Sequence, residues 1–520
     1  MSFKLIGMFH RCFAPLLTIA VLVTIVGASI STTTSPISWD DGLRHITMAR
    51  VMRQEGVDQT WSRFFFGGYF AEHPVDPWLL ADVSYIPFTA FADPVALRLY
   101  SIFGIFVLLL SMWRVLQSLK LPAGWLCLLL MLTLMDSGLY VRLLLGRPFV
   151  WSTIFSLLTL DAILRRRPAA VALVLLLATL FSQLFVFPLL VVGAASLYSL
   201  LCRRVGDGVW IALATLIGVV AGILLHPHSW EYVQYLVHVF IQIPFSSRTL
   251  SLGSEMQPSM SASPAVALLG ITLLLLFGGV RQGSARWSDA LRIGTPLIAL
   301  LVLPLLLAYV LAWMRAIDLL WPLLVVLLGH VFVLSRPFVG DLFHVRMDPV
   351  LPKVRGGTLV VVILILAFVS IPIRHAGILS KDDAERSMTH LAALQVLPDG
   401  ARVLNPEWFF FPPYVAANPR LTFATGIDNT FTWKPNPEAY ELLEAYFSIA
   451  ARTPNPVLDI PSWLQQLIEI YPSDYLVVSR KWAERLLPKL RVTPGLTPLT
   501  QSGDLIEVFS IDATTFLQEQ

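Results

Sequence analysis

The sequence predicts a polytopic α-helical membrane protein with an α/β domain at its carboxy-terminal end, and two observations lead to this prediction. Of the 520 residues, 56% are hydrophobic and only 14% are charged, whereas about 25% of the residues in a water-soluble domain are charged. Apolar stretches of membrane-spanning length recur up to about residue 373, and mixed polar sequence follows them. We therefore expect a transmembrane domain at 1–373 and an extracytoplasmic α/β domain at 374–520.

About eleven apolar stretches reach or approach the roughly 18–20 residues that cross a bilayer. The first follows a basic start, as the core of a secretory signal does, but its apolar part is long enough to span and we expect it to be retained. The stretches lie at 13–30, 96–118, 121–136, 148–164, 168–182, 184–201, 208–225, 263–280, 290–312, 316–335 and 357–373.

The basic residues predict how these stretches are oriented. Clusters of lysine and arginine fall on alternate connections, so that all of them belong to one side, which the positive-inside rule makes cytoplasmic. The clusters are Lys4 with Arg11, Arg114 with Lys120, Arg165 to Arg167, Arg203 with Arg204, Arg281 with Arg286, and Arg336 with Lys353 and Arg355. In a bacterial-type inner or plasma membrane, we expect the amino terminus inside, and the long loops 31–95 and 226–262 and the carboxy-terminal domain outside.

The carboxy-terminal sequence alternates between strand-like and helix-like segments. The strand-like segments are ARVLNP, TFATGID, DYLVVS and LIEVFSI, which start at residues 401, 422, 474 and 505. Helix-like segments lie at 382–396, 437–450, 461–470 and 480–490. This alternation predicts a small α/β layer structure.

Composition excludes several classes of function. The net charge of +3 is dispersed in short clusters, so nucleic acid is not an expected partner. The chain contains neither a GxxxxGK[ST] nor a GxGxxG phosphate loop, and its cytoplasmic connections are short, which excludes ATP-driven transport by this chain alone. The three cysteines lie outside the long outer segments, so no disulfide framework is expected.

An acidic pair, Asp40 and Asp41, opens the first outer loop in the stretch SWDDGLRHITMARVM. One of these carboxylates at the membrane surface could act as a general base on an acceptor, while its neighbour orients it or holds a divalent cation. The alternative is structural: Asp41 would cap an interfacial amphipathic helix whose arginines touch lipid headgroups.

The layout of this region resembles the GT-C superfamily of membrane glycosyltransferases. The resemblance rests on a retained first helix, a long outer loop that opens with WDDG, and YFAEHPVDPWLL before the second helix, and it covers about residues 1–262. HPVDP resembles the usual hPPL motif of this loop but departs from it at Val75 and Asp76. The resemblance implies transfer of a sugar from a polyprenyl-phosphate carrier to a glycan, lipid or protein acceptor. It also implies catalytic roles for Asp40 or Asp41, and for Asp136 in LMDSGLY.

Three arginines stand on the outer side, where the positive-inside rule disfavours them. Arg142 and Arg147 flank the start of the fourth stretch, and Arg315 lies on the turn before the tenth. An arginine can hold phosphate oxygens bidentately, so these residues are candidates for binding the donor phosphate. The alternatives are snorkelling to headgroups or structural pairs with Asp136 or Asp318.

Two further groups of outer residues are candidates for binding. His226, His228 and Glu231 could hold a divalent metal such as Mg²⁺ or Mn²⁺ or contact substrate, although histidines among aromatic residues also form interfacial belts. Their loop, 226–262, is either a mobile lid or a plain connector. In the tail, Asp428 and Trp433 could bind the acceptor, unless the aromatic residues around them serve to dock the domain.

Taken together, the residues and the resemblance favour a glycosyltransferase that acts on the extracytoplasmic face. Two alternatives remain open. A transporter or flippase of lipid-linked saccharide would place ionisable residues in mid-membrane and break its helices. A non-catalytic membrane assembly protein would retain every activity after replacement of Asp41 by asparagine.

Overall fold

The computed structural model describes residues 16–28, 41–121, 124–133, 137–245, 263–281, 295–311, 316–335, 391–452, 459–500 and 505–517. The chain divides into two compact units. The helical unit comprises 1–34, 98–225 and 254–380, and the mixed unit comprises 35–97, 226–253 and 381–520. Most of the two long loops thus fold together with the carboxy-terminal part of the chain.

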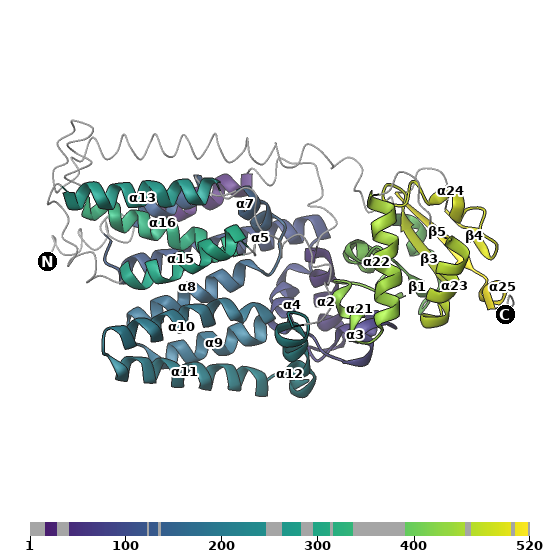
Figure 1. The fold of residues 1–520 in the computed structure, drawn as a ribbon, viewed down its shortest axis with the longest axis horizontal. Helices are drawn as coiled ribbons and strands as arrows, with labels where there is room; N and C mark the ends of the chain where they lie inside the picture. Colours follow the sequence, from purple (N-terminus) through teal and green to yellow (C-terminus); the bar gives the residue numbers. More distant parts are fainter. Residues whose placement is uncertain are drawn as a thin grey trace. The chain divides into compact units, whose positions relative to one another are not determined.

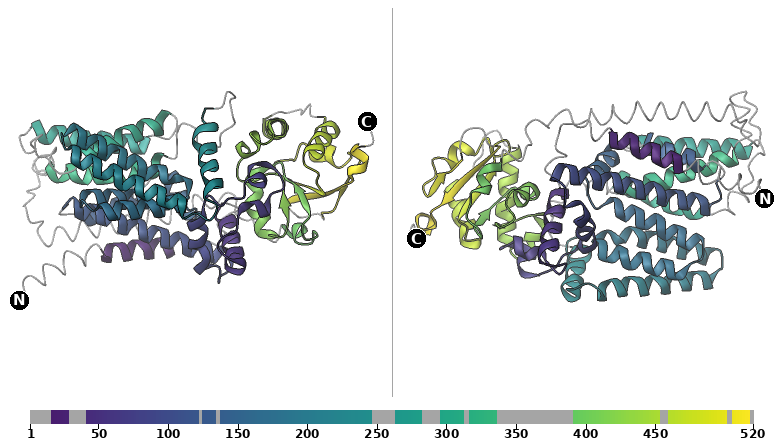
Figure 2. Two further views of the ribbon diagram at one scale, coloured as in Figure 1. Left: turned by 90° about the horizontal axis from the view of Figure 1, so that it is seen from below. Right: turned by 180° about the vertical axis from the view of Figure 1, so that it is seen from behind.

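Apolar helices that run side by side build the helical unit (Figures 1 and 2). After a first helix at 16–28 come α5 (Asp93–Ser118, in this unit from residue 98), α6 (Gly124–Thr133), α7 (Ser137–Leu144), α8 (Val150–Leu164), α9 (Pro168–Phe181), α10 (Val186–Leu201), α11 (Val205–Leu224), α13 (Ser263–Arg281), α15 (Thr295–Leu311) and α16 (Ile317–Leu334).

The predicted membrane protein is confirmed, but the number of eleven spans is not. Among the described residues, three helices are both long and apolar enough to cross a bilayer alone, Asp93–Ser118, Gln183–Leu201 and Val205–Leu224, and the other apolar helices have 10–17 residues. The predicted stretch at 357–373 lies outside the described residues. Leu213, Leu216 and Ile217 on α11 are each more than half exposed, as the lipid-facing side of a membrane helix requires.

Two glycines let α11 approach α9 closely. A Cβ atom at Gly218 would lie 2.4 Å from the carbonyl oxygen of Ala172, and one at Gly222 would lie 2.7 Å from Cβ of Thr179. The two glycines are four residues apart and therefore face the same side of the helix. Van der Waals contact between backbones, which needs no hydrophobic driving force, thus holds this helix pair together inside the bilayer.

A five-stranded sheet lies at the centre of the carboxy-terminal part of the mixed unit, which confirms a small sheet in this region. Its strands are β1 (Arg402–Leu404), β2 (Thr422–Phe423), β3 (Tyr475–Ser479), β4 (Leu496–Pro498) and β5 (Ile506–Ile511), in the order β2-β1-β3-β5-β4. β1 is parallel to β2 and β3, whereas β5 is antiparallel to β3 and β4, and Val477 pairs with Val508. The sequence predicted every strand except β4, a three-residue edge strand whose proline masks its pattern.

Helices cover the sheet where the alternation predicted them. α22 (Pro437–Arg452) and α23 (Ile460–Ile470) pack Leu443 and Leu467 into one core with Leu476 and Phe509 of the strands (Figure 1). Helix formation within the predicted 480–490 segment is confined to α24 (Leu487–Leu490). Of the segment at 382–396, residues 392–395 form the short helix α19, and residues before 391 lie outside the described part.

The first outer loop folds onto this sheet as a set of short helices. They are α2 (Asp41–Glu55), the 3-10 turn η1 (Trp61–Phe64), α3 (Gly68–Glu72), α4 (Leu79–Tyr85) and the 3-10 turn η2 (Ile86–Phe88). The amide of Phe66 donates a 3.1 Å hydrogen bond to the carbonyl of Phe423, which extends the β2 edge of the sheet. α2 packs against α4 and against α20 (Phe411–Ala417) of the tail.

A carboxyl group is buried beyond the end of β1. Glu407 accepts a 2.8 Å hydrogen bond from the hydroxyl of Tyr446 and a 2.7 Å bond from the amide of Ser479, and it is fully buried. Burial raises the pKa of Glu407 to about 8, although both hydrogen bonds favour the ionised form. The folded domain therefore holds a proton that the unfolded chain would release.

We predict that this proton makes the stability of the mixed unit fall as the pH rises. The stabilising contribution of Glu407 is complete below its unfolded pKa of about 4.5 and is lost as the pH rises through about 8, at about 1.4 kcal/mol per unit of pKa difference. Replacing Glu407 by glutamine should flatten this dependence, whereas the exposed Glu484→Gln variant should keep it. Hydrogen exchange of β3 and β5 between pH 5 and 9 measures the effect, and equal slopes in both variants would contradict the prediction.

Candidate functional site

Asp41 begins helix α2 and is held there by an arginine one turn later. Nε of Arg44 donates a 3.1 Å hydrogen bond to Oδ1 of Asp41. The Asp41 side chain is 24% exposed, whereas that of Arg44 is only 2% exposed. The acid therefore stands at the edge of the protein, and the cation that orients it lies inside.

Two tryptophans enclose the Arg44 guanidinium. Its central carbon lies 4.1 Å from the ring centre of Trp78 and 5.4 Å from that of Trp61. Both rings are buried, so the attraction between the cation and the aromatic faces acts without competition from water. The rings also fix the direction of the guanidinium plane and thereby the position of the Asp41 carboxylate.

Asp76 fastens both tryptophans. Its Oδ1 accepts a 3.0 Å hydrogen bond from Nε1 of Trp61 and a 2.9 Å bond from the amide of Trp78. The second bond closes an Asx turn around Pro77, which directs the chain into α4. The departure at Asp76 from the usual motif of this loop thus supplies the acceptor that orders the aromatic cage.

A second buried carboxyl, Asp82, lies beside the first. Its Oδ1 is 2.5 Å from Nδ1 of His45, and both side chains are fully buried. The second oxygens of both carboxyls, Oδ2 of Asp76 and Oδ2 of Asp82, are buried without a hydrogen-bond partner among the described residues. Burial raises the pKa of Asp76 to about 6, and burial and then the charge of Asp76 raise the pKa of Asp82 well above its ordinary range. Burial therefore favours the protonated, uncharged form of Asp82.

The second outer loop completes this cluster from the other side. It forms α12 (Ser229–Val237), which is preceded by His226 and followed by the π-helical turn η4 (His238–Gln242). Nδ1 of His226 accepts a 3.1 Å bond from the amide of His228, so its Nε2 carries the proton and donates to the carbonyl of Asp76 at 2.9 Å. Burial lowers the pKa of His226, which keeps the ring neutral.

The contacts of these histidines bear on the expected metal. His226 uses both ring nitrogens within the protein, and Nε2 of His228 lies 3.3 Å from the carbonyl of Asp58. In the described part of the chain, no three histidine, cysteine or acidic side chains are arranged to hold a metal ion. The divalent metal therefore stays a prediction, and we derive no step through one.

The predicted acceptor residues lie around α21 (Thr430–Trp433). Oδ1 of Asp428 accepts a 2.9 Å hydrogen bond from the amide of Thr430 and so helps to start this helix. Trp433 ends the helix and is half-buried. The structure thus gives Asp428 a local structural contact and leaves Trp433 partly accessible.

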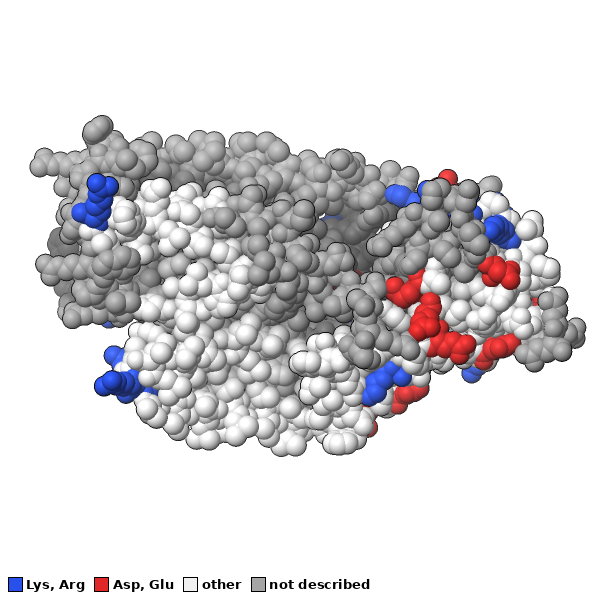
Figure 3. All heavy atoms as spheres, viewed as in Figure 1, with Lys and Arg blue, Asp and Glu red and all other residues white. Residues whose placement is uncertain are grey.

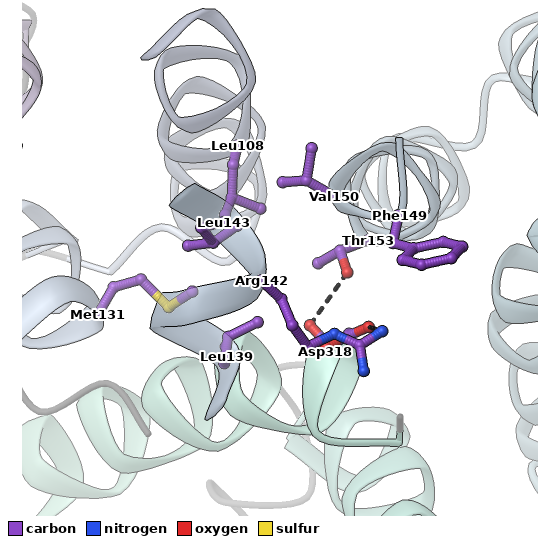
Figure 4. Close-up of a pocket in the computed structure, with 9 residues that line it drawn as sticks. All are labelled: Leu108, Met131, Leu139, Arg142, Leu143, Phe149, Val150, Thr153 and Asp318. Atoms are coloured by element: carbon purple, nitrogen blue, oxygen red, sulfur yellow. Dashed lines mark hydrogen bonds and ion pairs between the residues drawn. The ribbon is translucent and has the colours of Figure 1, made fainter. Parts of the chain in front are cut away.

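Arg142, a candidate for binding phosphate, pairs with Asp318 in the helical unit. Its Nη2 lies 2.9 Å from Oδ2 of Asp318, whose carbonyl accepts a 3.0 Å bond from Thr153 (Figure 4). The side chains of Arg142 and Asp318 are 10% and 5% exposed. The cavity beside them has a volume of about 10 Å³, room for about one water molecule. The structure thus contains the pairing with Asp318, one of the alternatives to phosphate binding that the sequence left open for Arg142.

The other predicted residues are only partly placed. Arg147 is half-buried, with its guanidinium carbon 5.8 Å from the ring centre of Phe149. Asp40, Asp136 and Arg315 lie outside the described residues.

Sequence reasoning missed the buried members of the cluster around Asp41. Arg44, His45, Trp61, Trp78 and Asp82 were not recognised as site residues. One signal was present: Asp82 is a charged residue inside the apolar stretch WLLADVSYIPF, where an acid needs a buried partner.

Comparison with known proteins gave no match to a family model and no match among curated proteins. Solved structures do match. ArnT from Cupriavidus metallidurans bound to undecaprenyl phosphate aligns with a TM-score of 0.56 at 13% identity, over 95% of this chain and 97% of that one. The apo state of the same protein aligns with a TM-score of 0.54 at 14% identity, over 96% and 98%.

At such low identity the likeness shows the fold alone, but it extends over nearly the whole of both chains. It therefore includes the carboxy-terminal half, which the sequence resemblance did not cover. The protein is an integral membrane protein that shares the overall fold of these structures.

Proposed function

We propose that the chain is a membrane glycosyltransferase that moves a sugar from a polyprenyl-phosphate carrier to an acceptor on the extracytoplasmic face. The resemblance to the GT-C superfamily supports the class, and the solved neighbour bound to undecaprenyl phosphate supports a lipid-linked donor. Since a fold can host unrelated functions, the site has to carry the argument. The observation that carries it is a partly exposed carboxylate, Asp41, locked by a buried arginine.

In the proposed reaction Asp41 accepts the proton of the acceptor. A hydroxyl or amino group of the acceptor forms a bond to the anomeric carbon of the sugar while the bond from that carbon to the phosphate oxygen breaks. The bonding electrons leave with the phosphate, which stays on the polyprenyl chain. The proton passes to the Asp41 carboxylate, whose fixed position shortens the search for a reactive geometry.

Arg44 acts on this reaction as a positioning residue. Its guanidinium presents Nε to Asp41 while its flat faces meet Trp61 and Trp78. A lysine could supply the charge but neither the directed N–H nor the planar stacking. Asp76 keeps the tryptophans in place through its two hydrogen bonds, and burial, which raises the pKa of both Asp76 and Asp82, limits the negative charge in the interior.

The donor phosphate would be held by Arg147 and by Arg315. Arg142 is a weaker candidate because Asp318 already satisfies it. In this proposal the basic turns of the helical unit face the cytoplasm, and the mixed unit lies outside. Asp40, Asp136, Asp428 and Trp433 remain candidates around the acceptor, and a divalent metal remains a prediction.

We predict that Asp41→Asn lowers the turnover number about 10²–10⁴-fold, the usual contribution of a general base. Asparagine keeps the size of the side chain and can still accept a hydrogen bond from Arg44, so the fold and donor binding should persist. The assay measures sugar transfer from synthetic polyprenyl-phosphate sugars by the full chain in vesicles. Asp58→Asn, in the same loop region, is the control and should retain full activity. Undiminished transfer by Asp41→Asn would remove Asp41 from the mechanism.

Arg147→Ala combined with Arg315→Ala should abolish retention of the polyprenyl-phosphate donor. Native mass spectrometry of the gently extracted protein shows the bound lipid and identifies the sugar by its mass. Arg420→Ala with Arg485→Ala removes the same charge from exposed positions of the mixed unit and should leave binding intact. Retention of only bulk phospholipid by the wild type, even after incubation with polyprenyl-linked sugars, would favour a non-catalytic assembly protein.

The raised pKa of Asp82 predicts a difference between two substitutions. Asparagine copies the uncharged acid, since it has the same size and its oxygen can still accept a hydrogen bond from Nδ1 of His45. Asp82→Asn should therefore change the melting temperature and the transfer rate little. Asp82→Ala leaves buried partners unsatisfied, which costs about 1–3 kcal/mol, and should lower both. Equal damage by the two substitutions would mean that Asp82 is ionised.

A further inference from the structure

Three helices of the helical unit end in the same turn, with a cation at the position that favours glycine. Lys120, Arg166 and Arg203 have φ angles of 54°, 54° and 56°, and each lies two residues beyond the end of its helix. In each turn the next amide bonds back to a carbonyl five residues earlier, at 2.8–3.1 Å. This is the Schellman motif, in which glycine is the usual residue. A residue with a side chain is strained in this left-handed conformation, so the stability of the fold does not explain why lysine and arginine occupy these positions.

Two of these turns border one cavity. The cavity has a volume of about 250 Å³ and lies where α8 ends and α11 begins. Its polar lining comes from Arg166, Arg204, Asp207, Tyr198, Ser199 and Trp210, and the rest of its wall is apolar. All of these residues belong to the helical unit.

The charges around the cavity favour an anion. Asp207, the one acid in the lining, lies 3.0 Å from Nη2 of Arg166, and the two side chains are 25% and 64% exposed. A pair this exposed is weak, so Arg166 can turn to another anion. α11 begins at the cavity, where its N-cap residue Arg204 and its first-turn residue Asp207 lie in the lining, and it has no side-chain cap, so it adds the positive end of a helix dipole.

The surroundings of the cavity are those of a bilayer surface. Leu201 and Val209, on the two helices beside it, are 69% and 60% exposed, and both helices are long enough to span. Tyr198 and Trp210 are the residue types found at the headgroup level. In Figure 3 blue side chains stand at the end of the helical unit where these turns lie, beside a mostly white flank.

We propose that this cavity binds the phosphate of an anionic phospholipid, with Arg166 and Arg204 on the phosphate oxygens and the acyl chains along α10 and α11. Basic pockets between membrane helices recognise such headgroups. The site is distinct from the proposed donor site, because Arg147 precedes α8 and Arg166 follows it. At 1.5 Å per residue the 15 residues of α8 separate them by about 22 Å. The proposal therefore does not depend on sugar transfer.

The test compares two double variants of the full chain that lose the same charge. Arg166→Gly with Arg204→Gln removes both lining arginines, and Arg203→Gly with Arg167→Gln removes their neighbours, which do not line the cavity. Each pair places one glycine at a left-handed position, so neither should weaken the fold. Native mass spectrometry in neutral detergent measures the affinity for phosphatidylglycerol and for phosphatidylcholine.

The wild type should bind the first phosphatidylglycerol at least about tenfold more tightly than phosphatidylcholine, a difference of about 1.4 kcal/mol. The lining variant should lose this preference, and the neighbour variant should keep it. Equal loss in both variants would overturn the proposal, because it would show diffuse attraction to basic loops, and so would no loss in either. Displacement of the lipid by millimolar glycerol 3-phosphate would also overturn it, since the ligand would then be a soluble phosphate.

Discussion

The structure of the mixed unit around Asp41 depends on the contacts of one buried cation, the guanidinium group of Arg44. A cation with 2% exposure is stable only if aromatic faces and carboxylates replace the water it has lost. Trp61 and Trp78 supply the faces, Asp41 accepts from Nε, and the charge of Arg44 favours the ionised form of the nearby Asp76. The first outer loop is thereby folded around a charge and presents one carboxylate at its edge.

In this arrangement the residues that fix the position of Asp41 are buried, and Asp41 itself is accessible. The groups behind Asp41 are buried, with hydrogen bonds from Trp61 and Trp78 to Asp76 and between His45 and Asp82. The second outer loop is tied to the same cluster through His226 and the Asp76 carbonyl. Only the last member, Asp41, remains partly exposed. The catalytic role proposed for Asp41 requires such a preorganised group, whose position is fixed by the buried residues behind it.

The helical unit follows the different physics of the bilayer. Where lipid surrounds the helices, close backbone approach at Gly218 and Gly222 replaces hydrophobic burial as the packing force. A charge inside the bundle is paired, as Arg142 is with Asp318. Exposed positive charge is placed at the helix ends, even at Arg166 and Arg203, where the backbone would be less strained with glycine.

Composition and periodicity determined the class of the protein and most of the carboxy-terminal sheet. A high content of apolar residues places a chain in the membrane whatever its tertiary contacts are, and short runs of strand-forming residues mark strands locally. The membrane class and the strands could therefore be predicted without a structure. The position of helix α2 could be predicted from the sequence, but its burial could not, because a surface helix and a buried helix can begin with the same acidic residue. Its burial, and the roles of Arg44, His45 and Asp82, were decided by contacts between residues as far apart as His45 and Asp82, or Asp76 and His226. No local pattern records such contacts, since they arise only when separate segments of the chain share one core.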